Sequence, residues 1–212
     1  MACSLRIPRL PGVRQLDLQA LRSRLLAEGE HGSLQSQSWE EFRVDDVDVK
    51  FSIGYAYTTV YLLFEVHEPE IRATYRNHLD PVYRDSCVEF FIADAQGRYL
   101  NVECNPFGAV LSGIGTGRTG RTLMEPEFFG KLQVDTSLYE GNESGWEALL
   151  RIPLDGAGLV KSSDDLSSLS FTGNLYKCGD DLQRPHYLSW SPIGTKQPDF
   201  HQSAYFGSFA FS

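Results

Sequence analysis

Hydrophobic and polar residues alternate with a period of two along most of the chain after residue 46. Clear alternation marks residues 47–53, and the apolar run at 60–66 is of strand length. Similar runs occupy residues 83–92, 99–105, 109–114, 132–136, 146–152, 170–177, 187–190 and 206–211. Clusters of Gly, Pro, Asn and Asp separate them, as they do between β-strands. The pattern predicts an all-β fold, a two-sheet antiparallel β-sandwich of jelly-roll-like form.

The N-terminal segment follows a different pattern. Residues 1–15 show no periodicity and are expected to be irregular. Leucines recur at helical spacing between residues 16 and 28, with Asp17 near the start and Gly29 just after the end, which predicts a short amphipathic helix. We therefore interpret residues 1–37 as an N-terminal extension with a short helix and residues 38–212 as the β-sandwich domain.

Two consecutive strands concentrate polar groups on one face. In residues 83–92 the apolar positions Val88, Phe90 and Ile92 oppose Glu89, and a turn-like segment at 94–97 leads into the next run. If the two runs pair as a hairpin, one face carries two carboxylates, two amides and a phenol, from Glu89, Glu103, Asn101, Asn105 and Tyr99. Such planar polar groups suit sugar hydroxyls, and neighbouring aromatic rings suit the C–H faces of sugars.

Composition narrows the classes of partner. The 212 residues carry a formal net charge of −9, which argues against binding to a nucleic acid backbone. Aromatic residues make up 12% of the chain, as in many β-proteins and carbohydrate binders. No apolar stretch is long enough to span a membrane, and residues 1–15 lack an apolar leader, so a cytoplasmic location is expected.

The cysteines give no sign of a metal site or a disulfide framework. Cys3, Cys87, Cys104 and Cys178 have no paired spacing, and the five histidines are scattered. Cys87 and Cys104 fall on opposite faces of their strands, so a bridge between them is not expected. The sequence therefore predicts free thiols in a reducing compartment and no metal ligands.

Several segments, taken in order, resemble the family 9 carbohydrate-binding modules and their DOMON-like relatives. The resemblance covers residues 38–211. Its markers are Trp39, residues 83–92, Gly-Trp-Glu-Ala-Leu-Leu-Arg-Ile-Pro at 145–153, residues 171–176, Leu-Ser-Trp-Ser-Pro at 188–192, Asp-Phe-His at 199–201 and Phe-Gly at 206–207. It implies the same jelly-roll-like sandwich that the strand pattern predicts.

The resemblance also implies a ligand site. In that family two aromatic rings clamp a terminal sugar, and polar side chains of a concave sheet bind its hydroxyls. The clamp positions, usually Trp in the family, fall on Tyr83 and Phe200, both expected at the rim. The polar positions fall on Glu89, Asn101, Glu103 and Asn174, with Asn101 standing where the family has an arginine. Some members bind calcium, but no ligand set maps onto this chain, so no cofactor is predicted.

Three functions are consistent with these observations. The first is a non-catalytic carbohydrate-binding protein that recognises a mono- or oligosaccharide end in a concave cleft with an aromatic rim. The second is a glycoside-active enzyme with Glu89 and Glu103 as an acid/base pair, since glycosidases hold two carboxyls roughly 5–10 Å apart. The third is a DOMON-like haem binder, which needs axial Met or His; Met1 and Met124 are the only methionines. The sequence leaves the sugar and the oligomeric state open.

Overall fold

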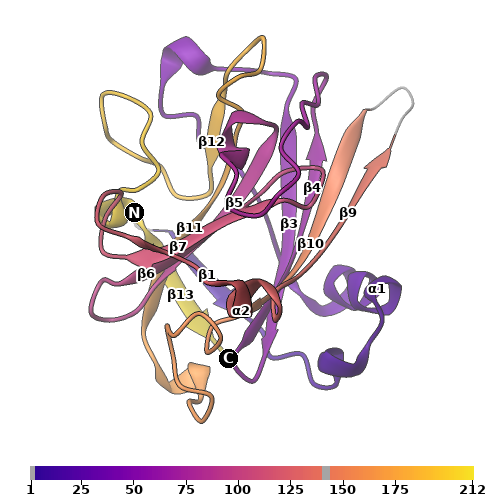
Figure 1. Ribbon diagram of the computed structural model, residues 1–212, viewed down its shortest axis with the longest axis vertical. Helices are drawn as coiled ribbons and strands as arrows, with labels where there is room; N and C mark the ends of the chain where they lie inside the picture. Colours follow the sequence, from indigo (N-terminus) through magenta and orange to yellow (C-terminus); the bar gives the residue numbers. More distant parts are fainter. Residues whose placement is uncertain (1–2, 140–143) are drawn as a thin grey trace.

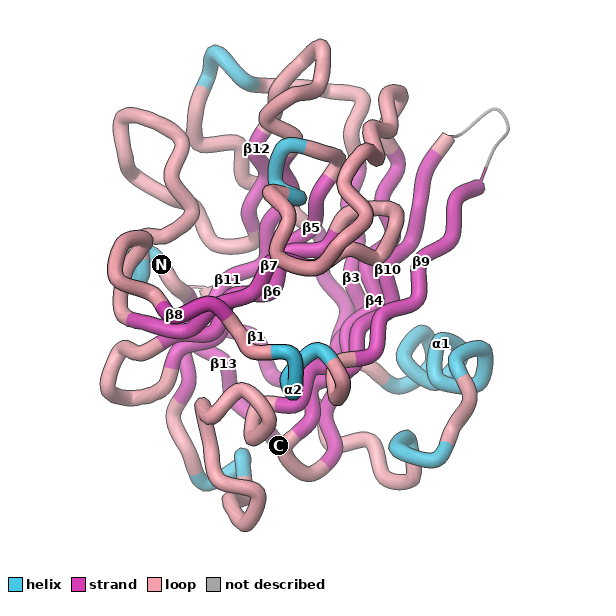
Figure 2. The backbone as a smooth tube through the Cα atoms, viewed as in Figure 1, coloured by secondary structure: helices cyan, strands magenta, loops and turns pink. Residues whose placement is uncertain are grey.

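Strands with one apolar face build two β-sheets that pack against each other (Figures 1 and 2). The computed structural model describes residues 3–139 and 144–212. The first sheet has the order β1 (Ser4–Ile7), β13 (Gly207–Phe211), β11 (Phe171–Cys178), β5 (Cys87–Ala93), β6 (Tyr99–Cys104), β7 (Val110–Gly115) and β8 (Thr122–Leu123), with β12 (Tyr187–Ser189) paired to β11. The second has the order β2 (Glu30–Ser33), β3 (Asp48–Ala56), β4 (Thr59–His67), β10 (Gly145–Pro153) and β9 (Gln133–Tyr139). The predicted antiparallel sandwich is confirmed, and one pair, β1 with β13, is parallel.

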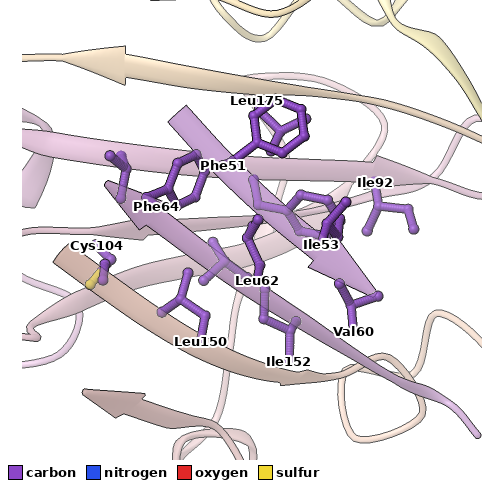
Figure 3. Packing of buried hydrophobic residues seen from close by; sticks show 14 of the residues in the cluster. Phe51, Ile53, Val60, Leu62, Phe64, Ile92, Cys104, Leu150, Ile152 and Leu175 are labelled. Carbon is purple, nitrogen blue, oxygen red and sulfur yellow. The ribbon is translucent and has the colours of Figure 1, made fainter. Parts of the chain in front are cut away.

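The inner faces of the two sheets form the main core. Phe51 on β3 and Phe64 on β4 meet Leu175 on β11 and Ile92 on β5, and all four side chains are almost completely buried (Figure 3). The residues between them along each strand point outward, as the period of two requires. The core therefore fixes the register, and with it the set of residues on each outer face.

A helix covers the outer face of the second sheet. In α1 (Leu18–Glu28), Leu21 and Leu25 are fully buried and pack with Tyr61 and Leu63, which face away from the main core. Asp17 caps the helix by accepting a hydrogen bond from the amide of Ala20 at 2.8 Å. The predicted helix is confirmed, and Figure 1 shows it on the side of this sheet away from the first sheet.

Long loops cover the outer face of the first sheet. A second apolar cluster lies between this face and segments from residues 38–42, 68–85 and 190–206. Its members from the sheet include Phe91, Tyr99 and Tyr176, and those from the loops include Trp39 and Phe200. Loops thus cover part of the face that the sequence predicts to be polar, and only the rest of it is open to a ligand.

Residues 1–37, interpreted above as an extension, contribute strands to both sheets. β1 pairs with β13, and β2 pairs with β3. The expectation of irregular structure is wrong at Ser4–Ile7, because Leu5 and Ile7 are buried against the core. The short elements β8 and α2 (Pro126–Phe129) are also absent from the sequence prediction. No helix in the described part of the chain is long and apolar enough to cross a membrane.

A buried ion pair closes one end of the sandwich. Lys177 Nζ lies 2.9 Å from Glu68 Oε2, and both side chains are fully buried. The ammonium also donates to the carbonyl of Cys178 at 2.9 Å and lies 3.1 Å from Nε2 of His186. Trp146 Nε1 donates to the other carboxylate oxygen of Glu68 at 2.7 Å. The charges are therefore paired and hydrogen-bonded, which makes their burial tolerable.

Candidate functional site

The open part of the first sheet is built around two glutamates on neighbouring strands. Glu89 on β5 pairs directly with Glu103 on β6, and Tyr176 on β11 lies on the other side of Glu89. In the next row Phe91 lies between Asn101 and Asn174. Residues two positions apart along a strand point to the same face of the sheet. The register therefore confirms that Glu89, Glu103, Asn101 and Asn174 lie on one face.

A cavity of about 270 Å³ lies over this face. Its floor and walls come from four parts of the chain: Glu89, Glu103 and Leu111 on the sheet; Tyr83 in the turn before β5; Arg118 and Arg121 in the loop after β7; and a C-terminal group of Cys178, Asp180, Tyr187, Pro198, Asp199, Phe200 and His201. Its volume is close to the lower bound of about 300 Å³ for small-molecule sites, so it suits one small ring rather than an extended chain.

Two of the predicted site residues do not line the cavity. Asn101 is fully buried; its amide nitrogen donates to Glu103 Oε1 at 2.8 Å, and its oxygen accepts from Arg121. Asn174 is also fully buried, and its side chain bonds both the amide and the carbonyl of Ser191. The nitrogen and the oxygen of both side-chain amides thus have partners within the protein. Asn101 therefore positions Glu103 and Arg121, and Asn174 holds the loop that follows β12.

The two aromatic residues predicted for the rim have different environments. Tyr83 lies in the turn η3 (Val82–Arg84), is half-buried and lines the cavity. Phe200 also lines the cavity, but its side chain is only 8% exposed. Its ring stacks on Tyr176 with centroids 4.1 Å apart and packs against Trp39. The rim position expected for Phe200 is thus wrong, because the loop folds inward to cover the aromatic cluster.

The turn that carries Tyr83 is held by a buried aspartate. Asp85 is fully buried, and its Oδ2 accepts hydrogen bonds from the amides of Thr74 and Tyr75 at 2.8 and 2.9 Å. The same oxygen accepts from Asn105 Nδ2 at 2.9 Å, and Arg72 lies 3.4 Å from Oδ1. One carboxylate thereby ties the loop of residues 68–84 to the end of β6.

The loop after β7 supplies a positively charged wall of the cavity. The sequence did not predict this wall. Arg121 reaches Asn101, and Arg118 lies 3.7 Å from Asp199. Arg121 and the hydroxyl of Tyr99 both contact Nδ1 of His201, at 3.3 and 3.0 Å. A guanidinium only donates, so Nδ1 is the acceptor here and His201 is neutral. Burial and the two arginines lower the pKa of His201 to about 3, in agreement with this state.

Arginine therefore reaches the site from a loop rather than from the sheet. The resemblance placed Asn101 where the family has an arginine. The guanidinium of Arg121, from the loop after β7, donates a hydrogen bond to the side-chain oxygen of that asparagine. The signal for this was the Gly/Arg/Thr-rich segment at residues 113–120, which lies directly before Arg121. Its path over the sheet depends on the pairing of β7 with β8, which strand periodicity does not predict.

Burial favours the protonated form of both glutamates. It raises the pKa of Glu89 well above its usual range, with Cys178 and Glu103 close by. It also raises the pKa of Glu103 to about 7, although the nearby Arg121 opposes the shift. Burial thus favours at Glu89 the neutral carboxyl, which both donates and accepts, and Glu103 is close to its midpoint near neutral pH.

We expect Glu103 to make the fold less stable as the pH rises. The folded protein binds this proton more tightly than the unfolded chain, whose carboxyl has the ordinary pKa near 4.5. The resulting stabilisation is complete below about pH 4.5 and is lost as the pH rises through about 7. Glu103→Gln should therefore be more stable than the parent protein at pH 8, by on the order of 2–3 kcal/mol.

Urea unfolding at a series of pH values tests this expectation. The difference between Glu103→Gln and the parent should be small at pH 4.5 and should grow toward pH 8. Glu30→Gln, at an exposed position on β2, is the matched control and should show no such growth. A difference that is constant across the range would contradict the raised pKa of Glu103.

Comparisons with known proteins agree with this geometry. Residues 24–211 match the model of a family described as carbohydrate-binding family 9. No curated protein matches the chain. A solved structure of a candidate carbohydrate-binding protein from Bacteroides uniformis ATCC 8492 is 31% identical, with 100% of both chains covered and a TM-score of 0.90.

Two further structures are more distant. A family 9 carbohydrate-binding module from Caldicellulosiruptor kristjanssonii, in complex with cellotriose, is 14% identical, with 99% of this chain and 93% of that chain covered and a TM-score of 0.65. A module of the same family and organism, in complex with glucose, is 13% identical, with 99% and 96% covered and a TM-score of 0.63. At these identities the likeness shows a shared fold.

Proposed function

Because this chain belongs to carbohydrate-binding family 9, we propose that it binds the end of a mono- or oligosaccharide in the cavity above Glu89 and Glu103, without catalysing a reaction. The observation that carries the proposal is the cavity itself. It lies on the sheet face that bears the paired glutamates, and it has the size of one small ring.

The lining suits a sugar ring. Burial favours the protonated form of Glu89, which donates and accepts, Glu103 adds acceptors, and Arg118 and Arg121 donate only, so hydroxyls in both roles find partners. The ring of Tyr83 offers a flat apolar face for C–H groups. The proposed partner is thus a carbohydrate, and the proposal includes neither a nucleic acid nor a membrane.

Ligands of the relatives suggest where to begin. The Caldicellulosiruptor modules were solved with cellotriose and with glucose, so a glucosyl end is the first class to test. The aromatic wall here is Tyr and Phe rather than Trp, which offers less stacking area. We therefore expect weak binding, with a dissociation constant roughly in the micromolar to millimolar range.

A glycan array on the purified protein, followed by calorimetry with the best ligand, tests the proposal. Tyr83→Ala should weaken binding about tenfold, because it removes one stacking face together with its buried area, a loss of roughly 1–2 kcal/mol. Tyr83→Phe, which keeps the ring, should bind nearly as the parent does. Phe200 is less useful here, since its replacement also removes core contacts with Tyr176.

Tyr57→Ala provides the matched control. Tyr57 is a tyrosine with 64% of its surface exposed in the β3–β4 turn of the other sheet, so its loss should leave sugar binding unchanged. An array without any ligand, or a Tyr83→Ala variant that binds as tightly as the parent, would overturn the assignment of the cavity.

One observation favours glycoside hydrolysis as a second candidate function. Glu89 and Glu103 are paired across two strands at the cavity floor, and the pKa of each is raised, as the pKa of a general acid often is. Prolonged incubation with aryl glycosides distinguishes the candidates. Release of the aryl group that disappears in Glu103→Gln would favour the enzyme, whereas binding without release favours the module.

A further inference from the structure

Two cysteines and a glutamate come together at the floor of the cavity. Cys178 on β11 pairs directly with Cys87 on β5, and Glu89 follows two residues later on the same face as Cys87. The two sulfur atoms and a carboxylate oxygen of Glu89 all lie within 4.8 Å of one another. Sequence spacing gave no sign of this cluster, because the pairing of β5 with β11 joins residues about ninety positions apart.

We propose that Cys87, Glu89 and Cys178 bind one thiophilic divalent cation, zinc above all. Zinc takes thiolate and carboxylate ligands at about 2.3 and 2.0–2.2 Å, and tetrahedral ligands at these lengths lie roughly 3.5 Å apart. Cys178 Sγ is 3.1 Å from Glu89 Oε1, close to the separation of two ligands on one zinc ion. Two sulfur ligands out of three favour zinc over calcium or magnesium, which prefer oxygen.

The fourth coordination position opens toward the cavity. Glu89 and Cys178 both line the cavity, whereas Cys87 lies fully buried beside them. The ion therefore has a path of entry and keeps one position for water or another small oxygen ligand. Zinc sites with three protein ligands and one open position are typical of centres that bind a further molecule.

The charge of the cluster also suits a cation. Glu89 has no ion-pair partner among the residues that the structure describes, although it is almost completely buried. A cation bound here would compensate the buried carboxylate. Thiols bind zinc as thiolates, so binding releases protons and the affinity should rise with pH.

Titration of the reduced protein with cobalt(II) chloride tests the site. We expect one equivalent to bind, with the near-ultraviolet charge-transfer band of cobalt–thiolate bonds and the visible bands of a tetrahedral ion. Zinc chloride should displace the cobalt, and a tenfold excess of calcium chloride should not. Protons should be released as zinc binds, and the apparent affinity should be higher at pH 8 than at pH 6.

Single substitutions identify the ligands. Cys87→Ser and Cys178→Ser should each lower zinc affinity by more than about 100-fold, since the loss of a ligand exceeds the effect of an outer partner. Cys104→Ser is the matched control: Cys104 is equally buried, but on the opposite face, within the main core. It should bind zinc as the parent does. Circular dichroism shows which variants are folded, and any one folded ligand variant suffices for the test.

Two results would overturn the metal site. One is that the parent protein, once reduced, binds neither cobalt nor zinc at pH 8. This result would overturn the site even if the protein contains a Cys87–Cys178 disulfide before reduction. The other is a folded Cys87→Ser or Cys178→Ser variant that binds zinc as tightly as the parent. Neither result depends on sugar binding, which is measured separately by calorimetry.

Discussion

Lys177→Met should lower the free energy of unfolding by about 3–5 kcal/mol, the usual cost of removing one partner from a buried ion pair. The substitution keeps the apolar length of the side chain but leaves the carboxylate of Glu68 without its cation. That carboxylate would retain Trp146 Nε1 as a donor, and burial of the remaining charge would be uncompensated. Urea denaturation at neutral pH measures the loss.

A double substitution separates the charge from the packing. Glu68→Gln combined with Lys177→Met removes both charges, so its cost should be clearly less than the sum of the two single costs. Lys161→Met, at an exposed lysine, is the matched control and should change stability by less than about 0.5 kcal/mol. Additive costs in the double variant would mean that the two side chains do not interact.

Asp85→Ala should cost a similar amount, about 3–5 kcal/mol, and should also release the loop before β5. The substitution removes the acceptor of three hydrogen bonds, donated by the amides of Thr74 and Tyr75 and by the side chain of Asn105. Hydrogen bonds to a charged group contribute roughly 1.5–3 kcal/mol each. Denaturation gives the global cost, and trypsin cleavage at the exposed Arg76 reports on the loop.

Asp80→Ala is the control in the same loop. Asp80 accepts hydrogen bonds from Asn77 only three residues away, so its loss should be local and small. Tyr83 should lose its place over the cavity in Asp85→Ala but not in Asp80→Ala, and sugar affinity should follow. Equal cleavage rates at Arg76 in the two variants would contradict an anchoring role for Asp85.

The sequence predicted most of the strands, because their periodicity reflects burial directly. On β5, Val88, Phe90 and Ile92 belong to the main core, and Glu89 faces the other way. The strands it did not predict have four residues or fewer. Ser-Leu-Arg-Ile in β1 and Glu-His-Gly-Ser in β2 carry too little pattern to stand out, and only their partners β13 and β3 make them strands.

For the site, the alternation of residues along each strand predicted which face a side chain occupies, but not which side chains from other segments lie next to it. It placed Glu89 and Glu103 on one face, as the register has them. Asn174 has the same parity, yet the loop at Ser191 covers it and uses its amide. Arg121 and Cys178 reach the cavity only through pairings between distant strands or through loop paths. These depend on tertiary packing, which no local pattern in the sequence reports.

The parallel pairing of β1 with β13 has a mechanical meaning. Ser4 lies beside Ser208, and Ile7 lies beside Phe211, so the start of the first strand and the end of the last strand lie at opposite ends of one ladder. A pull between the two ends of the chain therefore acts along the ladder and loads its hydrogen bonds in shear, all together. A hairpin pulled from its open end would instead lose its bonds one after another. The pairing of β1 with β13 should therefore resist such a pull better than a hairpin does.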